Sequence, residues 1–404
     1  MKQRKTSIFS SFLTIFVVSS SAIAQPSQFS SRGPGGGGAL FASSFNPTDP
    51  NEIYVGCDMS EIFHTTDLGT SWNILDFRQA QSWKTAPIQI CNNNVGYAID
   101  GSNVNGNDVQ RPTKSTDGGI TWKPLPNDAS GGGAFSLFAD PDNNQHVIMS
   151  DYRIIYTSTD GGNQFFTRYQ AKDNGAGILL AGAFFDGNNI YLGTNDGLLV
   201  STDGGVTFSI ANITGIPSSE FIVSFTGAKQ NGTTRFFCVT LSQVYAGITG
   251  ADKDAFKNVY KMDWGSGTWQ AAKTGIDASA LPFFAAMSPT NINIAYVAGG
   301  SSNASPTVFK TTDGGGSWVS VFKTTNNQNI STGWSGQGGD RAWSYGEYAL
   351  GFSVAPSDPN YAVITDLGYA HITSNGGTDW HAAYVPAADQ NPKGSNTPTG
   401  KTYH

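Results

Sequence analysis

The chain has 404 residues, of which 49 are Gly, 12% are aromatic and only 13% are charged. This composition favours short strands joined by tight turns and argues against a helical protein, which would need more Ala, Leu, Glu and Lys. The net charge of -7 is mild, and Lys and Arg form no cluster beyond the first five residues, so we expect no nucleic-acid surface.

The N-terminus resembles a secretory signal peptide. Residues 1–24 combine a basic start, an apolar run over 8–18 and an A-x-A cleavage site at 22–24. The apolar run is too short to span a bilayer permanently, and no other stretch approaches a membrane span. We therefore expect an exported, secreted or periplasmic protein. A lead-in rich in Gly, Pro and Ser follows over residues 25–39.

The three cysteines are Cys57, Cys91 and Cys238. Export permits a disulfide, but an odd number leaves at least one thiol unpaired. Cys57 and Cys91 lie in apolar, strand-like runs, so we interpret them as buried small side chains. No Cys/His spacing resembles a zinc site, and we expect neither a metal nor a cofactor.

A four-strand unit begins after the lead-in. Strands are predicted over residues 40–45, 53–57, 62–65 and 71–75, separated by turns rich in Asn, Asp, Pro and Gly. Later units keep the same order of strand A, turn, strand B, turn, strand C, Asp-Gly turn and strand D. A polar tail over 386–404 follows the last unit.

The Asp-Gly turn between strands C and D occurs seven times, and we call these copies the repeat turns. They span Thr65–Trp72, Ser115–Trp122, Ser158–Phe165, Ser201–Phe208, Lys261–Trp269, Thr311–Trp318 and Thr373–Trp380; the fifth, KMDWGSGTW, carries an insertion. Successive copies lie 43 to 62 residues apart, which is the period of propeller blades. The sequence thus predicts an all-β, seven-bladed β-propeller of four-stranded antiparallel blades over residues 40–385.

The repeat turns resemble the Asp box, or BNR repeat, of sialidases, xyloglucan-specific glucanases, sortilin-type receptors and photosystem assembly factors. This resemblance covers nearly all of the chain after residue 39; it is specific for the fold and unspecific for function. The Asp can accept backbone hydrogen bonds, the second Gly permits an unusual backbone conformation, and the terminal Trp or Phe can pack between blades. We interpret the repeat turns as structural.

Antiparallel strand order places the A–B turns and the repeat turns on one face, here the bottom face. The B–C turns and the connections between blades then lie on the top face, where we expect function. Its predicted segments include 76–86, 103–111 and the long connection 322–348.

Aromatic and charged side chains in the top-face segments suit a carbohydrate, because rings pack on sugar faces and carboxylates bind or activate hydroxyls. An alternative for 322–348 is a loop that folds its own aromatics over the propeller centre. The candidate sugar-binding residues are Arg78, Trp83, Tyr152, Arg153, Trp334, Arg341, Trp343 and Tyr345, with Asp340 and Glu347 as possible catalytic carboxylates.

Four B–C turns carry an Asp at equivalent places, namely Asp58, Asp151, Asp196 and Asp366. Turn preference alone explains Asp there, so a structural role is the default. Residues 36–67 are, however, similar to the opening of the xyloglucan-specific glucanases, and the resemblance places one of their catalytic carboxylates at Asp58. The family's Asp-x-Gly-Gly is replaced by Asp-Met-Ser-Glu over 58–61, and those enzymes use two propellers. Asp366 is the candidate second carboxylate, because blades one and seven are neighbours in a ring.

Other functions remain open. A sialidase needs an arginine cluster, and the Tyr152–Arg153 pair alone does not supply one; a polysaccharide lyase would need a Tyr/His pair that the scattered histidines do not offer. The leading hypothesis is a glycoside hydrolase acting on a β-glucan or xyloglucan-type polysaccharide, alone or with a second propeller. The alternative is a non-catalytic glycan- or protein-binding propeller, including a partner-binding assembly factor.

Overall fold

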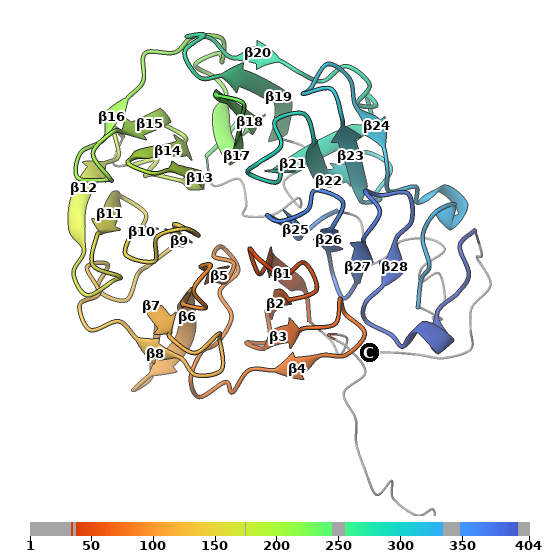
Figure 1. The fold of residues 1–404 in the computed structure, drawn as a ribbon, viewed down its shortest axis with the longest axis horizontal. Coiled ribbons are helices and arrows are strands. Elements are labelled where there is room, and N and C mark those ends of the chain that lie inside the picture. Colours follow the sequence, from red (N-terminus) through yellow and green to blue (C-terminus); the bar gives the residue numbers. More distant parts are fainter. Residues whose placement is uncertain (1–33, 35–37, 174, 245–254, 334–347, 395–404) are drawn as a thin grey trace, which may run out of the picture. The chain divides into compact units, whose positions relative to one another are not determined.

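The computed structural model describes residues 34, 38–173, 175–244, 255–333 and 348–394. These residues form seven four-stranded antiparallel sheets arranged in a ring (Figure 1). The predicted all-β, seven-bladed propeller is confirmed. The sheets are numbered here as blades 1 to 7 in chain order. The proposed signal peptide over 1–24 lies outside the described residues.

Each blade takes its four strands from one continuous stretch of chain, in the order A to D from the axis outward (Figure 1). The A strands are β1 (Leu40–Phe45), β5 (Gln89–Ile90), β9 (Ser136–Ala139), β13 (Leu180–Asp186), β17 (Phe221–Gln230), β21 (Ala280–Ala286) and β25 (Gly351–Val354). The B strands are β2 (Ile53–Cys57), β6 (Gly96–Val104), β10 (Val147–Ser150), β14 (Asn189–Thr194), β18 (Thr233–Leu241), β22 (Ala295–Ser301) and β26 (Ala362–Thr365).

The outer two strands of each blade complete the sheets. The C strands are β3 (Ile62–Thr65), β7 (Asn107–Ser115), β11 (Ile154–Ser158), β15 (Gly197–Ser201), β19 (Phe256–Asp263), β23 (Thr307–Thr311) and β27 (Ala370–Thr373). The D strands are β4 (Asn73–Ile74), β8 (Lys123–Pro124), β12 (Phe166–Gln170), β16 (Ser209–Ile210), β20 (Gln270–Ala271), β24 (Val319–Ser320) and β28 (His381–Ala382). Two short 3-10 turns, η2 (Thr325–Asn327) and η3 (Ala387–Asp389), lie near the end.

The hydrophobic core is divided among the interfaces between blades. One apolar cluster, for example, joins Val55 of β2 to Val363 of β26, and another joins Leu192 of β14 to Ile155 of β11. Both faces of a blade are therefore covered, which is why β2, β10 and β26 are buried along their whole length. The three cysteines are buried and free, which confirms the interpretation of Cys57 and Cys91 from the sequence.

The repeat turns other than the fifth share a recurring set of hydrogen bonds, whereas in the fifth the Asp263 carboxylate accepts from Arg235. In the second, Gly119 N donates to Ser115 Oγ (2.9 Å), while Thr121 N (2.9 Å) and Thr121 Oγ1 (2.6 Å) donate to the two oxygens of Asp117. Gly119 has φ of +83°, a value that favours glycine, and an added Cβ would meet the Tyr54 hydroxyl of blade 1.

Hydrogen bonds also identify the two faces. The first Gly of a repeat turn donates to the A–B turn of its own blade, as in Gly118 N to Asn94 O (2.9 Å) and Gly376 N to Asn360 O (2.9 Å). The repeat turns and A–B turns therefore share the bottom face. The B–C turns and the connections between blades lie at the opposite ends of the strands, on the top face.

One predicted top-face loop is a hairpin. Residues 103–111 were expected to connect strands B and C of blade 2, but β6 and β7 continue through them to a two-residue turn at Asn105-Gly106. Both turn residues have positive φ, 53° for Asn105 and 86° for Gly106, which is the conformation that Asn-Gly favours in a hairpin. The Asn-Gly pair was the signal for this extension.

Candidate functional site

The carboxylate of Asp58 lies at the top of blade 1. Asp58 is exposed, and its Oδ1 accepts a hydrogen bond from Ala39 N (2.8 Å), while its own N donates to Ala39 O (3.0 Å). The next residue, Met59, is 62% exposed. Burial raises the pKa of the neighbouring Cys57 thiol to about 11, so this thiol stays protonated at neutral pH. Asp58 is thus a fixed, solvent-facing carboxylate.

Asp366 lies at the equivalent place in blade 7 and has a different environment. It is only 2% exposed, and its Oδ1 accepts a hydrogen bond from Tyr369 N (3.0 Å). Its backbone carbonyl accepts a hydrogen bond from Leu40 N (2.9 Å). The following residue, Leu367, is 38% exposed.

The structure brings the two turns together through consecutive residues, the last of the lead-in (Ala39) and the first of β1 (Leu40). Ala39 bonds to Asp58 and Leu40 bonds to Asp366, so both B–C turns meet at the start of β1. We call this junction of blades 1 and 7 the seam. The turn with the exposed Asp58 and the turn with the buried Asp366 therefore lie next to each other on the top face.

The connection over 76–86 lies beside the seam. Ser82 N donates to Ser60 O (3.0 Å), and Gly101 N donates to Gln81 O (3.2 Å), so the connection bridges blades 1 and 2. Trp83 is half-buried and packs against the apolar cluster of blades 2 and 3. Arg78, by contrast, forms a two-point ion pair with Asp76 (2.9 and 2.6 Å) at the surface.

The top of blade 3 carries the Tyr-Arg pair. Tyr152 is 51% exposed and its ring lies 4.5 Å from that of Phe135, while Arg153 is exposed. Burial raises the pKa of Tyr152, which keeps its hydroxyl protonated. Asp151 caps its own turn, because its Oδ1 accepts hydrogen bonds from the backbone N of residues 153 (2.6 Å) and 154 (2.7 Å).

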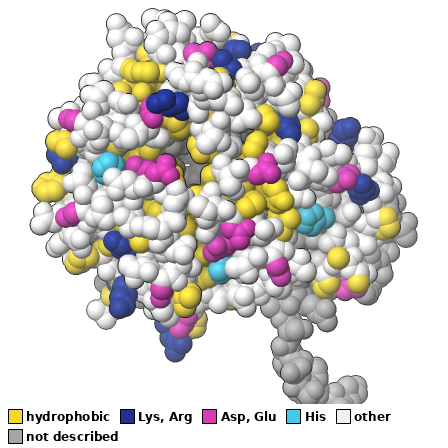
Figure 2. All heavy atoms as spheres, in the orientation of Figure 1, with side chains coloured by type: hydrophobic (Ala, Val, Ile, Leu, Met, Phe, Trp, Pro, Cys, Tyr) yellow, Lys and Arg dark blue, Asp and Glu magenta, His cyan; other side chains and the backbone are white. Residues whose placement is uncertain are grey.

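Two further arginines are engaged in ion pairs within blades. Arg111 pairs with Asp100 (2.7 Å), and Arg235 pairs with Asp263 of the fifth repeat turn (2.6 Å). On the face drawn in Figure 2, basic side chains are separated from one another. The described arginines therefore do not form the cluster that a sialidase requires.

The remaining candidates fall outside the described residues. They are Trp334, Asp340, Arg341, Trp343, Tyr345 and Glu347. Within the described ranges, no group of three or more His, Cys, Asp or Glu side chains is arranged to hold a metal ion. No helix there has the length and hydrophobicity needed to cross a membrane.

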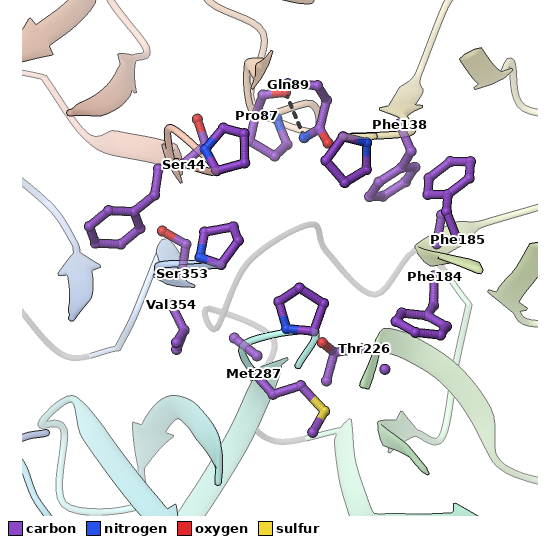
Figure 3. Close-up of a pocket in the computed structure, with 18 of the residues that line it drawn as sticks. Ser44, Pro87, Gln89, Phe138, Phe184, Phe185, Thr226, Met287, Ser353 and Val354 are labelled. Atoms are coloured by element: carbon purple, nitrogen blue, oxygen red, sulfur yellow. Dashed lines mark hydrogen bonds between the residues drawn. The ribbon is translucent and has the colours of Figure 1, made fainter. Parts of the chain in front are cut away.

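The A strands also line a central cavity. At its bottom end the cavity has a volume of about 500 Å³, with Phe138, Phe184, Phe185 and Met287 around it (Figure 3). The Lys229–Asp186 ion pair (2.7 Å) belongs to the same lining. Towards the top the cavity continues as a smaller space of about 190 Å³. Its wall is mainly apolar, and sequence reasoning did not single it out.

Comparisons with solved structures support the fold. The protein is similar to a GH74 enzyme from Niastella koreensis, with a TM-score of 0.66 and 18% identity over 88% of this chain and 55% of that chain. It is also similar to the GH74 xyloglucanase from Xanthomonas campestris, with a TM-score of 0.65 and 15% identity over 89% of this chain and 56% of that chain. The chain thus spans about half the length of these structures.

A third solved structure gives a weaker match over nearly its whole length. It is YCF48 bound to D1 peptide, with a TM-score of 0.50 and 14% identity over 85% of this chain and 95% of that chain. No protein-family model matches the sequence, and no curated protein matches it. At these identities the similarities show the propeller fold alone.

Proposed function

We propose that this is an exported carbohydrate-active protein, a glycoside hydrolase that cleaves a β-glucan or xyloglucan-type polysaccharide at the seam. The observation that carries the proposal is that the B–C turns of blades 1 and 7 meet at the start of β1, where Ala39 N donates to the Asp58 carboxylate (2.8 Å) and Leu40 N donates to the backbone carbonyl of Asp366 (2.9 Å). The similarity to GH74 structures, one of them a xyloglucanase, agrees with this substrate class.

Hydrolysis of a glycosidic bond needs two carboxyl groups, roughly 5 to 10 Å apart. One protonates the leaving oxygen, and the other activates water or attacks the anomeric carbon. Asp58 is exposed and can meet a polymer from solvent, so we assign it the role of base or nucleophile. Asp366 is the acid in this proposal. Asp340 and Glu347 are the alternative pair.

The substrate-contacting residues are proposed from the same face. Trp83 belongs to the connection that bridges blades 1 and 2 and packs against blades 2 and 3, while Tyr152 and Arg153 lie in the B–C turn of blade 3. Arg78, Trp334, Arg341, Trp343 and Tyr345 complete the proposed set. Aromatic rings would pack against sugar faces, while the arginines would donate hydrogen bonds to hydroxyls.

The test is release of reducing sugar from xyloglucan and from mixed-linkage β-glucan. We expect Asp58→Asn and Asp366→Asn each to lower kcat at least about 100-fold, because general acid or base catalysis contributes that much or more. Asp49→Asn is the matched control, since Asp49 is a turn residue of the same blade on the bottom face. Full activity in both seam variants would contradict the proposal.

A non-catalytic binding propeller is the second candidate. It is favoured by one observation, namely that the chain covers 95% of the YCF48 structure, which is bound to a peptide, but only 55% of the GH74 enzyme from Niastella koreensis. This alternative predicts binding of a glycan or peptide with no release of reducing sugar by the parent protein. Binding that persists in Asp58→Asn and Asp366→Asn would then separate recognition from hydrolysis.

A further inference from the structure

A second recess lies on the top face, between blades 4 and 5. It has a volume of about 430 Å³, which is within the range of roughly 300 to 1,000 Å³ typical of small-molecule sites. We call it the 4–5 groove. Its walls are the B–C turn of blade 4 over 194–198, the connection over 210–220 and the start of β17. Sequence reasoning named only Asp196 among these residues, and as a turn former.

Two carboxylates line the groove, and each is held by one of its oxygens. Asp196 Oδ2 accepts hydrogen bonds from the hydroxyl of Tyr169 (2.8 Å) and the backbone N of Lys172 (2.9 Å). Glu220 Oε2 accepts hydrogen bonds from Thr240 Oγ1 (2.6 Å) and the hydroxyl of Tyr260 (3.1 Å). These contacts come from strands and connections of three blades, so they fix both carboxylates before any ligand arrives.

The second oxygen of each carboxylate is available as an acceptor. Within the described part of the chain, neither Asp196 Oδ1 nor Glu220 Oε1 accepts a hydrogen bond, although both side chains are only half-buried. Burial raises the pKa of Tyr169 and of Tyr260. Both tyrosines therefore remain protonated donors at neutral pH and keep the carboxylates oriented.

The rest of the lining completes a mixed surface. Donors are offered by the exposed side chains of Lys172 and Ser218, while Ile213, Ile216 and Phe221 are half-buried and form an apolar wall. A small amine ligand would use only the two carboxylate acceptors and would leave the donors and the apolar wall unused. Sugar hydroxyls both donate and accept, and the C–H face of a sugar packs against apolar side chains. The groove thus offers the hydrogen-bond acceptors, the donors and the apolar surface that a sugar can use.

We infer that the 4–5 groove is a binding site for a neutral sugar, separate from the seam. The two carboxylates would repel uronic acids, so the ligand class is uncharged hexose-based oligosaccharides. Blades 4 and 5 lie across the ring from blades 7 and 1 (Figure 1), so the groove would hold a chain away from the proposed cleavage point. The inference rests on the chemistry of the groove and not on hydrolysis at the seam.

The test is calorimetric titration of the full chain with cellohexaose and, as the charged comparison, hexagalacturonic acid. Glu220→Gln keeps an oxygen that can accept from Thr240 and Tyr260 but removes the charge, and we expect it to weaken cellohexaose binding roughly ten-fold. Ser218→Trp fills the exposed mouth without removing a described hydrogen bond and should weaken binding similarly. Asp277→Asn, at an exposed carboxylate in the next connection, is the matched control.

The outcomes separate this site from the seam. Cellohexaose affinity that falls in Glu220→Gln and Ser218→Trp but not in Asp277→Asn or Asp58→Asn supports the inference, whether or not the protein hydrolyses the sugar. Affinity unchanged in both groove variants, absent from the parent, or equal for hexagalacturonic acid overturns it. Loss of hydrolysis confined to Asp58→Asn and Asp366→Asn would leave the proposed function standing in either case.

Discussion

At the scale of single residues, the carboxylates of the repeat turns act as fixed hydrogen-bond acceptors. The Thr121 hydroxyl and backbone lower the pKa of Asp117 to about 2, and Thr207 does the same for Asp203. Hydrogen bonds from Ser317 and Thr311 lower the pKa of Asp313 as well. Nothing in the sequence distinguishes these three aspartates from other acidic residues. The hydrogen bonds of the folded turn are what lower their pKa values.

The lowered pKa values predict acid sensitivity. A carboxylate whose pKa is lower in the folded state stabilises the fold above its unfolded pKa, near 4, and this contribution is lost as the pH falls toward 2. We therefore expect the urea midpoint of unfolding to fall between about pH 4 and pH 2.

The matched variant is Asp117→Asn, because the seventh repeat turn already works with Asn375, whose Oδ1 accepts from Asp379 N (2.9 Å). Unfolding curves at several pH values should show the parent more stable than the variant at pH 6, with the difference closing by pH 2. A difference that stays constant with pH would contradict the assignment.

At the scale of strands and sheets, the blades touch through glycines as well as large side chains. Gly182 of β13 and Gly193 of β14 face Phe225 of β17, and a Cβ at either position would fall on that residue. The close approach of blades 4 and 5 at this contact therefore requires residues without a side chain.

Adding one methyl group at this contact should be costly. We expect Gly193→Ala to lower the free energy of unfolding by roughly 1 to 3 kcal/mol, because the tightly packed interface cannot accept the extra volume. Gly133→Ala is the control, since the nearest atom to its added Cβ is 3.5 Å away and its φ is not positive. Chemical denaturation of both variants provides the measurement, and equal stabilities would refute the packing argument.

The sequence predicts the elements far better than the site. The repeat turns predict the number of blades and which turns share the bottom face. They can do so because each is a local hydrogen-bonded unit that a run of eight or nine residues specifies. Glu220 has no such local signal. Glu220 becomes a candidate only in the folded chain, where the connection over 210–220 places it within hydrogen-bonding distance of Thr240 and Tyr260. The position of Asp366 at the seam likewise depends on ring closure.

At the scale of the whole molecule, the ring closes without exchanging a strand. Blades 1 and 7 each come from one continuous stretch, so no shared strand joins them at the seam. Thr365 Oγ1 donates to Leu40 O (2.8 Å), and Trp72 Nε1 donates to Ala383 O (2.8 Å). Trp318 Nε1 makes the same kind of bond to Ala272 O in an ordinary interface (2.8 Å).

Replacement of Thr365, whose hydroxyl bonds across the seam, should destabilise the junction of blades 1 and 7 locally. Thr365→Val removes a buried bond to Leu40 and should cost about 1 to 3 kcal/mol. Thr194→Val, at an equally buried threonine, removes a bond to Gly197 within blade 4 (2.8 Å). In hydrogen exchange, we expect the backbone N–H of Leu40 to exchange faster in the first variant than in the second. Identical exchange at Leu40 would show that the seam does not open as a unit.

The closure of the ring between blades 1 and 7 has a consequence for folding during synthesis of the chain. Blade 1 is complete at Ile74, yet the last strand of its partner ends at Ala382, about 300 residues later. At ordinary translation rates that interval is on the order of 15 to 60 s. Throughout it, the side of blade 1 that carries Val55 and Trp72 has no neighbour to cover it. The nascent chain therefore exposes an apolar face of blade 1 until its final segment emerges, and this face is the part of the chain most prone to aggregate before the ring closes.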